Sequence, residues 1–132
     1  MPRPDPTGPR LLVVDDNEDN LDMLARRLKR RGYRVETAQS GADALEMIEN
    51  AAKGQFDAVL LDIMMPIVTG LDVLAKVRAT YSKTELPVLM ATAKSGSEDV
   101  VEALRLGAND YVTKPINFSE LLSALEVALK PS

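Results

Sequence analysis

Short apolar runs alternate with longer amphipathic segments along most of this chain. The apolar runs are continuous rather than alternating, which is typical of parallel strands covered on both faces. Each amphipathic segment places apolar side chains three and four positions apart, which is typical of a helix with one buried face. The pattern predicts strands at residues 10–15, 33–37, 57–62, 87–91 and 110–113. It predicts helices at residues 17–31, 41–52, 69–80, 97–106 and 118–130.

Local signals mark several ends of these helices. Ser40 followed three positions later by Asp43 predicts a helix start, because serine can accept a hydrogen bond from the first turn. Gly32 and Gly107 predict helix ends, since glycine readily adopts the left-handed conformation found there. The strict alternation of strands and helices predicts an α/β fold with a single five-stranded parallel sheet and right-handed crossovers. In the doubly wound, flavodoxin-like (βα)5 arrangement, the strand order is 2-1-3-4-5.

The length and the first residues bear on domain organisation. A chain of 132 residues is long enough for one domain with a proper core. Residues 1–9 contain four prolines and a glycine and no apolar stretch, so we expect a flexible tail at 1–9 and one domain at 10–131. The tail does not resemble a signal peptide, and no segment has the apolar length that spans a bilayer. We therefore expect a cytoplasmic protein with no membrane contact.

The composition excludes several kinds of chemistry. The sequence has neither cysteine nor histidine, so it cannot form a disulfide, a thiolate or histidine metal site, or a serine–histidine triad. A net charge of −4 argues against direct nucleic-acid binding by the domain as a whole. A functional site in this chain must therefore be built mainly from carboxylates, hydroxyls, amides and amino groups.

Polar residues interrupt the chain where four of the apolar runs end. Asp15-Asp16, Asp62, Thr92 and Lys114-Pro115 follow the first, third, fourth and fifth expected strands. In a parallel sheet these ends lie along one edge, and ligands bind there at the point where the strand order reverses. Strands one and three are neighbours at that point in the order 2-1-3-4-5. We therefore expect the three aspartates to face one another across a few ångströms.

Such a cluster has a definite chemistry. Three close carboxylates repel one another unless a cation joins them, and an all-oxygen site suits Mg²⁺. We expect Asp16, Asp62 and the backbone carbonyl of Met64 as metal ligands, with Asp15 acting directly or through water. Lys114 can neutralise the remaining charge and Thr92 can donate a hydroxyl to a phosphoryl oxygen, which is what phosphoryl transfer requires. Asp62 is the expected nucleophile, forming an acyl phosphate.

Each of these polar residues also has an ordinary structural interpretation. Asp15-Asp16 could cap the following helix, and Asp62 could be a turn aspartate before Pro66. Thr92 could likewise cap a helix, and a lysine before a proline is usually solvated at a turn. Four coincidences at four strand ends favour a site over these separate interpretations.

The motifs that carry this chemistry resemble the receiver domain of two-component response regulators, the CheY-like superfamily, over residues 10–130. The matching segments are VVDD at 13–16, DIMMP at 62–66, Gly70, Thr92-Ala93, Gly107-Ala108 and YVTKP at 111–115.

The resemblance implies a function and a role for each residue. The residue matching Asp62 accepts a phosphoryl group from the phosphohistidine of a sensor histidine kinase or a histidine phosphotransfer protein, with Mg²⁺ bound. Thr92 matches the switch hydroxyl, Lys114 the invariant lysine and Tyr111 the aromatic residue that changes rotamer. The surface of helix 97–106, strand 110–113 and helix 118–130 would then change and control an output domain or protein. The resemblance also implies that the Lys114-Pro115 bond is cis.

Two positions depart from the family pattern. Thr69 stands where family members often carry aspartate, and Val68 is smaller than the methionine often found there. Both lie outside the expected phosphoryl pocket, so they bear on the surface of helix 69–80 rather than on the chemistry.

Other functions are weighed against this one. A phosphatase with an aspartyl-phosphate intermediate usually has an acid two residues after its nucleophile, where this chain has Met64. A flavodoxin-like mononucleotide binder needs Ser, Thr or Gly after strand one, and residues 15–20, DDNEDN, place negative charge there instead. A scaffold that binds partners without phosphorylation is opposed by the complete set of pocket residues. We therefore expect a switch module that catalyses only its own phosphorylation and hydrolysis, not an enzyme for external substrates.

Two surface features remain open. A basic cluster near the end of helix 17–31 suits either a solvated end that complements the helix dipole or a docking patch for an acidic partner. The apolar face of helix 118–130 extends beyond its core residues, which suits either a partner or homodimer face or simply the helix preference of alanine. The basic cluster comprises Arg26, Arg27, Lys29, Arg30 and Arg31, and the extended face comprises Ala124, Val127 and Ala128.

Overall fold

The computed structural model describes residues 8–51, 55–93 and 98–130. Its elements alternate strictly between strand and helix. The strands are β1 (Arg10–Val14), β2 (Arg34–Ala38), β3 (Ala58–Asp62), β4 (Val88–Thr92) and β5 (Asp110–Thr113). The helices are α1 (Glu18–Arg30), α2 (Gly41–Asn50), α3 (Gly70–Thr80), α4 (Glu98–Leu106) and α5 (Phe118–Leu129). No helix in these described ranges is both long enough and apolar enough to cross a membrane.

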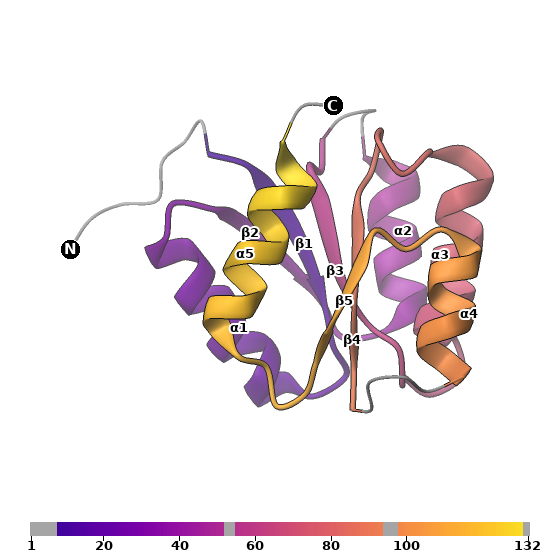
Figure 1. Cartoon of the computed structure of the whole chain (residues 1–132), viewed down its shortest axis with the longest axis horizontal. Coiled ribbons are helices and arrows are strands. Elements are labelled where there is room, and N and C mark those ends of the chain that lie inside the picture. Colours follow the sequence, from indigo (N-terminus) through magenta and orange to yellow (C-terminus); the bar gives the residue numbers. More distant parts are fainter. Residues whose placement is uncertain (1–7, 52–54, 94–97, 131–132) are drawn as a thin grey trace.

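The five strands form one parallel sheet in the order β2-β1-β3-β4-β5, which confirms the predicted fold class. Helices α1 and α5 cover one face of the sheet, and α2, α3 and α4 cover the other (Figure 1). The central strands are buried on both faces, which explains why their apolar runs are continuous.

Successive side chains of each strand enter different cores. Leu12 and Val14 of β1 belong to the core under α2, α3 and α4, whereas Leu11 and Val13 belong to the core under α1 and α5. This period of two follows from the pleat of the strand. The two cores hold the sheet rigidly between its helical layers.

Side-chain caps set where the helices begin. The Asn17 side chain accepts a hydrogen bond from the Asn20 N–H at 3.0 Å, and Ser40 Oγ accepts one from the Asp43 N–H at 3.1 Å. The second cap confirms the helix start expected from Ser40. The first shows that Asn17, rather than Asp15-Asp16, caps α1, so the capping interpretation of those two aspartates is wrong.

The element bounds differ from the sequence expectations by one or two residues. Helix α1 lacks residues 17 and 31 because both are cap positions, and β1 ends at Val14. The expected ends at 52, 97 and 131 lie outside the described residues. Residues 1–7 of the expected tail also lie outside them, whereas Gly8 and Pro9 accept hydrogen bonds through their carbonyls from Arg34 Nε at 2.7 Å and Arg34 N at 2.9 Å.

A half-buried arginine joins three segments at the end of the sheet where the strands begin. Arg78 of α3 donates from Nε to the Gly107 carbonyl at 2.8 Å and from a terminal nitrogen to the Leu86 carbonyl at 2.8 Å. Its other terminal nitrogen donates to Asn109 Oδ1 at 2.9 Å, and Asn109 Oδ1 also accepts from the Val88 N–H at 2.9 Å. Burial lowers the pKa of Arg78, and the oxygens that accept its hydrogen bonds from Gly107, Leu86 and Asn109 are neutral. The arginine therefore ties the end of α3 to the start of β4 and to the α4–β5 turn.

Replacing this arginine with an apolar side chain of similar length should destabilise the domain. Arg78→Met leaves several half-buried carbonyls without their donor, and we expect a loss of about 2–4 kcal/mol in unfolding free energy. Arg105→Met is the matched control, because Arg105 is exposed and its ion pair with Glu102 lies on the surface of α4. We expect that change to stay within about 0.5 kcal/mol. Urea titration of both variants compares the two, and equal losses would contradict this role for Arg78.

Candidate functional site at the carboxyl edge of the sheet

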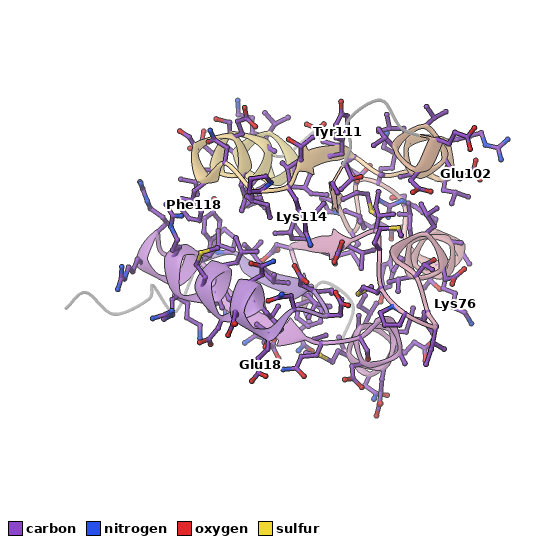
Figure 2. The ribbon with its side chains drawn as sticks, turned by 90° about the horizontal axis from the view of Figure 1, so that it is seen from below. Glu18, Lys76, Glu102, Tyr111, Lys114 and Phe118 are labelled. Atoms are coloured by element: carbon purple, nitrogen blue, oxygen red, sulfur yellow. The ribbon has the colours of Figure 1, made fainter. Side chains whose placement is uncertain are left out.

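The register of the sheet brings the four polar strand ends to the same level. Val14 pairs with Leu61, so Asp15 and Asp62, the next residues, lie side by side at the ends of β1 and β3. Asp62 in turn pairs with Ala91, the residue before Thr92. Figure 2 views this edge and shows Lys114 directed inward between the two helical layers.

The Lys114 ammonium bridges two buried carboxylates. Its Nζ lies 3.0 Å from Asp15 Oδ2 and 3.0 Å from Asp62 Oδ2. The two aspartates are only 3% and 5% exposed. Burying two such charges side by side is costly without a shared cation, so this bridge makes the pair tolerable. The solvated-lysine interpretation of Lys114 is therefore wrong.

Backbone groups fix the orientation of both carboxylates. Asp15 Oδ1 accepts a hydrogen bond from the Asn17 N–H at 2.8 Å, and Asp62 Oδ1 accepts one from the Met64 N–H at 3.2 Å. Gly70 lies so close to Asp62 that a Cβ on it would stand 2.2 Å from the Asp62 carbonyl oxygen. Only glycine fits there, so the start of α3 is pressed directly against the end of β3.

Asp16 completes a group of three carboxylates. One oxygen from each of Asp15, Asp16 and Asp62 lies within 4.8 Å of the others. Asp16 is exposed whereas the other two are buried, so the group opens to solvent on one side. An all-oxygen donor set that is partly open fits a hard divalent cation such as Mg²⁺, which keeps several waters when it binds to proteins. The expected contribution of the Met64 carbonyl remains a prediction.

The pKa values reflect the competition between burial and pairing. Burial raises the pKa of Asp62 and the charge of Asp15 adds to this, while the Lys114 hydrogen bond and the Met64 N–H only partly oppose the rise. For Lys114, burial alone would lower the pKa, but hydrogen bonds to Asp62 and Asp15 outweigh it and the net pKa is raised. Lys114 therefore stays protonated more readily than an ordinary lysine, and it lies beside Asp62, whose anionic form is destabilised by burial.

Thr92 and Tyr111, the other two expected residues, lie on β4 and β5. Thr92 is 4% exposed, and its carbonyl accepts a hydrogen bond from the Lys114 N–H at 2.7 Å. The Lys114-Pro115 bond is cis, as the resemblance implied. Tyr111 lies apart from the carboxylates, on the side of β5 that faces α4 (Figure 2), and packs in part against the core under α2, α3 and α4. Its expected role as the aromatic switch residue remains a prediction.

The sequence analysis missed the capping roles of two residues near the site. Asn17 caps α1 and presents its N–H to Asp15, and its only sequence signal is an asparagine three positions before another polar residue. Thr69 forms a reciprocal capping box with Asp72: Asp72 N–H donates to Thr69 Oγ1 at 3.2 Å, and Thr69 N–H donates to Asp72 Oδ2 at 3.0 Å. The departure from the family pattern at position 69 therefore has a physical role at the start of α3.

Comparison with known proteins shows the family. The model of the response regulator receiver domain matches residues 11–126, and the chain belongs to this family. It is 41% identical to the uncharacterized transcriptional regulatory protein YkoG of Bacillus subtilis over 91% of this chain and 50% of that protein. It is 40% identical to the transcriptional regulatory protein PrrA of Mycobacterium tuberculosis over 94% of this chain and 51% of that protein. The chain thus spans about half the length of these relatives.

Solved structures give the same result for the fold. The chemotaxis response regulator CheY4 of Vibrio cholerae superposes with a TM-score of 0.84 at 33% identity. The match covers 93% of this chain and 100% of that one. NtrX from Brucella abortus superposes with a TM-score of 0.80 at 34% identity, covering 91% of this chain and 26% of that one. The CheY-like fold expected from the sequence is confirmed.

Removing the charge of Asp62 should stabilise the metal-free domain. Its raised pKa means that the folded state binds a proton more tightly than the unfolded state, so ionisation of Asp62 reduces stability as the pH rises. We expect Asp62→Asn to gain on the order of 1 kcal/mol at pH 7 without divalent cations. The gain should shrink as the pH falls below the raised pKa of the folded state, and it should vanish well below the ordinary carboxyl pKa, where wild-type Asp62 is protonated in both states.

Urea unfolding at a series of pH values in the presence of a chelator measures this gain. Asp22→Asn on the exposed face of α1 is the matched control for the loss of one carboxylate, and we expect it to change the unfolding free energy by less than about 0.5 kcal/mol. A gain that is the same at every pH would show that the ionisation of Asp62 is not its origin.

Proposed function

We propose that this chain is a phosphorylation-dependent switch in which Asp62 accepts a phosphoryl group from a phosphohistidine. The donor is a sensor histidine kinase or a histidine phosphotransfer protein, and the output is an altered surface on α4, β5 and α5 that controls an output domain or protein. The observation that carries this proposal is the Lys114 ammonium 3.0 Å from both Asp15 and Asp62. An ammonium group held there can stabilise the negative charge that develops on the phosphoryl oxygens.

The proposed step is an in-line displacement at phosphorus. A carboxylate oxygen of Asp62 forms a bond to phosphorus while the bond from phosphorus to the donor's imidazole nitrogen breaks. The bonding pair goes to the imidazole nitrogen, which leaves as a neutral ring after taking up a proton. Lys114 moves its charge from the Asp62 carboxylate to a phosphoryl oxygen, and the Thr92 hydroxyl donates to a second one. Positioning and charge stabilisation account for most of the catalysis in such transfers.

A divalent cation fits the proposal through Asp15, Asp16 and Asp62, whose oxygens lie within 4.8 Å of one another. When bound, Mg²⁺ would neutralise negative charge shared between these carboxylates and the phosphoryl group. The chain's own part is to hold Asp15 and Asp62 in fixed orientations through the N–H groups of Asn17 and Met64. The backbone carbonyl of Met64 would be a further ligand.

We propose that the switch runs from Asp62 through β4 to β5. The phosphoryl group adds about two negative charges and new acceptor oxygens. Thr92 bonds one of these oxygens and draws in the segment after β4, which opens room for Tyr111 to turn inward. Phosphorylation biases an existing equilibrium, so the new contacts must outweigh a gap of a few kcal/mol between the two states.

The alternative functions find less support in the site. A phosphatase for external substrates needs an acid at Met64, whose side chain is apolar and 66% exposed. A mononucleotide binder needs a phosphate loop after β1, where Asp16, Glu18 and Asp19 present exposed negative charge. The relatives are named as transcriptional regulatory proteins, which supports an output in the control of transcription. We also propose that the chain acts in the cytoplasm.

The central test is a phosphorylation assay by intact mass. Incubation with Mg²⁺ and a small acyl phosphate or phosphoramidate should add one phosphoryl group to the wild-type chain. Asp62→Asn should gain none, because an amide cannot form the acyl phosphate. Chelation of Mg²⁺ should reduce labelling of the wild type by at least about tenfold. Labelling of Asp62→Asn to the same extent as wild type would contradict the assignment of Asp62.

Tyr111 should separate phosphorylation from its consequence. In Tyr111→Ala we expect small-donor labelling to stay within about twofold of wild type, because Tyr111 lies outside the group of carboxylates. Hydrogen exchange on phosphorylation should change in α4, β5 and α5 of the wild type and much less in the variant. Loss of labelling in Tyr111→Ala would refute this division of roles.

A further inference from the structure

Helix α1 carries opposite charges on its two halves. The first half holds only acidic charges, at Glu18, Asp19 and Asp22, and the second half holds only basic ones, at Arg26, Arg27, Lys29 and Arg30. The helix dipole accounts for charges in the first and last turns of a helix, because its effect fades beyond them. Asp22 and Arg26 lie outside those turns. The separation of charge therefore extends further than the dipole requires.

The outward side of α1 gathers these charges in one stripe. The residues of the stripe are spaced by four, three and four positions, which places them on the same side of a helix. They are Asp19, Met23, Arg26 and Arg30. The opposite side of α1 is the buried one and consists of Leu21, Leu24, Ala25 and Leu28. The stripe therefore faces away from the sheet, and an exposed methionine, 40% accessible, stands in the middle of its charges.

The domain itself does not neutralise this stripe. Within the described ranges, no ion pair joins Asp19, Asp22, Arg26 or Arg30 to another residue. Asp22 and Arg26 are four residues apart, a spacing that allows an ion pair on a helix. Arg27 is held differently, since its guanidinium lies 4.1 Å from the ring centre of Phe118, which comes from α5 beside α1 (Figure 2). The charges of the stripe are thus open to a second molecule.

The charge pattern is complementary to itself when the helix is reversed. Leu24 is the middle residue of α1. Asp22 and Arg26 stand two residues to either side of it, and Asp19 and Arg30 stand five and six residues from it. In an antiparallel pair of such helices with their centres level, Asp19 of each helix meets Arg30 of the other. Asp22 of each helix likewise meets Arg26 of the other.

We propose that the exposed stripe of α1 is a contact between two copies of this chain, related by a twofold axis that crosses the helix near its middle. Each copy offers two carboxylates to two guanidinium groups of the other, and the two Met23 side chains form an apolar centre between them. A twofold contact uses the same surface on both copies, which is the property that the reversed pattern supplies. The inference does not depend on phosphorylation of Asp62.

A partner of another kind explains less of the stripe. An acidic protein would use Arg26 and Arg30 but would be repelled by Asp19 and Asp22, and a basic protein would meet the reverse difficulty. A second copy satisfies both halves at once. A parallel pairing of the two helices would set like charges together, so the charges also fix the antiparallel orientation.

The size of the contact determines its expected strength. One helix face covers less than the roughly 1,000 Å² that a stable interface buries, and exposed ion pairs each contribute little. We therefore expect a weak dimer, with a Kd of about 10 μM to 1 mM at low ionic strength. Raising NaCl from about 50 to 500 mM should weaken it by about tenfold or more, because the ion pairs are screened.

Two charge-reversed variants test the contact by sedimentation velocity over a range of protein concentrations. Asp19→Lys/Asp22→Lys makes the stripe wholly basic, and Arg26→Glu/Arg30→Glu makes it wholly acidic. Each variant alone should raise the Kd of self-association by at least about tenfold, since like charges then face one another. An equimolar mixture of the two should associate at least as tightly as wild type, because every pair is again opposite in charge.

Matched controls place the same charge changes on other helices. Glu46→Lys/Glu49→Lys alters exposed residues of α2, and Lys76→Glu/Arg105→Glu alters exposed residues of α3 and α4. Both should self-associate as wild type does. Circular dichroism checks folding, since reversing charges in the terminal turns opposes the helix dipole and should lower Tm by about 2–6 °C. The milder pair Asp22→Lys and Arg26→Glu avoids those turns and gives the same comparison.

Three results would overturn the inference. A wild-type chain that stays monomeric at millimolar concentration in low salt would show that the stripe does not join two copies. Reversed variants that associate as wild type does would place any dimer contact on another surface. A mixture that associates no better than its separate components would show that the two halves of the stripe do not meet. None of these measurements requires a phosphoryl donor, so their outcome is separate from that of the proposed function.

Discussion

A single ammonium group allows two buried carboxylates to stand side by side at the edge of this sheet. Asp15 and Asp62 are almost fully withdrawn from solvent, and Lys114 Nζ lies 3.0 Å from each. Without that cation, burial and mutual repulsion would drive one of the carboxylates to take up a proton. The bridge does not fully offset the burial of Asp62, whose pKa is still raised. Further positive charge near Asp62 would therefore stabilise its anionic form.

The rest of the fold serves to bring these three groups together. They come from β1, β3 and the end of β5, and they meet only because a parallel sheet in the order β2-β1-β3-β4-β5 aligns the carboxyl ends of its strands. Two apolar cores hold the sheet between its helical layers (Figure 1). Sites built on rigid strands keep their geometry better than sites built on loops. Asp62 is the last residue of β3, and Asp15 and Lys114 directly follow β1 and β5, while Asn17 and Met64 add orienting N–H groups.

The architecture and the main site residues could be predicted because they depend on patterns that recur along the whole sequence. Continuous apolar runs identify buried parallel strands, and a polar residue at the end of each run falls on the ligand-binding edge of such a sheet. The strand order was taken from the common doubly wound arrangement, and the convergence of the three aspartates followed from that order together with these two facts. The carbonyl of Met64 as a ligand and the switch roles of Thr92 and Tyr111 stay predictions, since they concern states with a bound group.

Other features depend on contacts that a linear pattern does not contain. Asp15, Asp16 and Asn17 are all good capping residues, and only the folded backbone assigns the cap to Asn17. In the sequence, Arg78 cannot be told from a solvated arginine on a helix. Only the fold brings the carbonyls of Leu86 and Gly107 close enough to accept its hydrogen bonds. The loop between β3 and α3 turns at Ile67, which has a φ of 68°. This turn is likewise set by packing against α2 and by the close approach of Gly70 to Asp62.

The most direct test of the central claim is a crystal structure of the chain with Mg²⁺ and beryllofluoride, which mimics a phosphoryl group on a carboxylate. The account predicts one ion about 2.1 Å from carboxylate oxygens of the aspartate group, the mimic on Asp62, and Lys114 Nζ within hydrogen-bond distance of the mimic. A mimic on another residue, or a Lys114 that remains bonded to Asp15 and Asp62 alone, would contradict it.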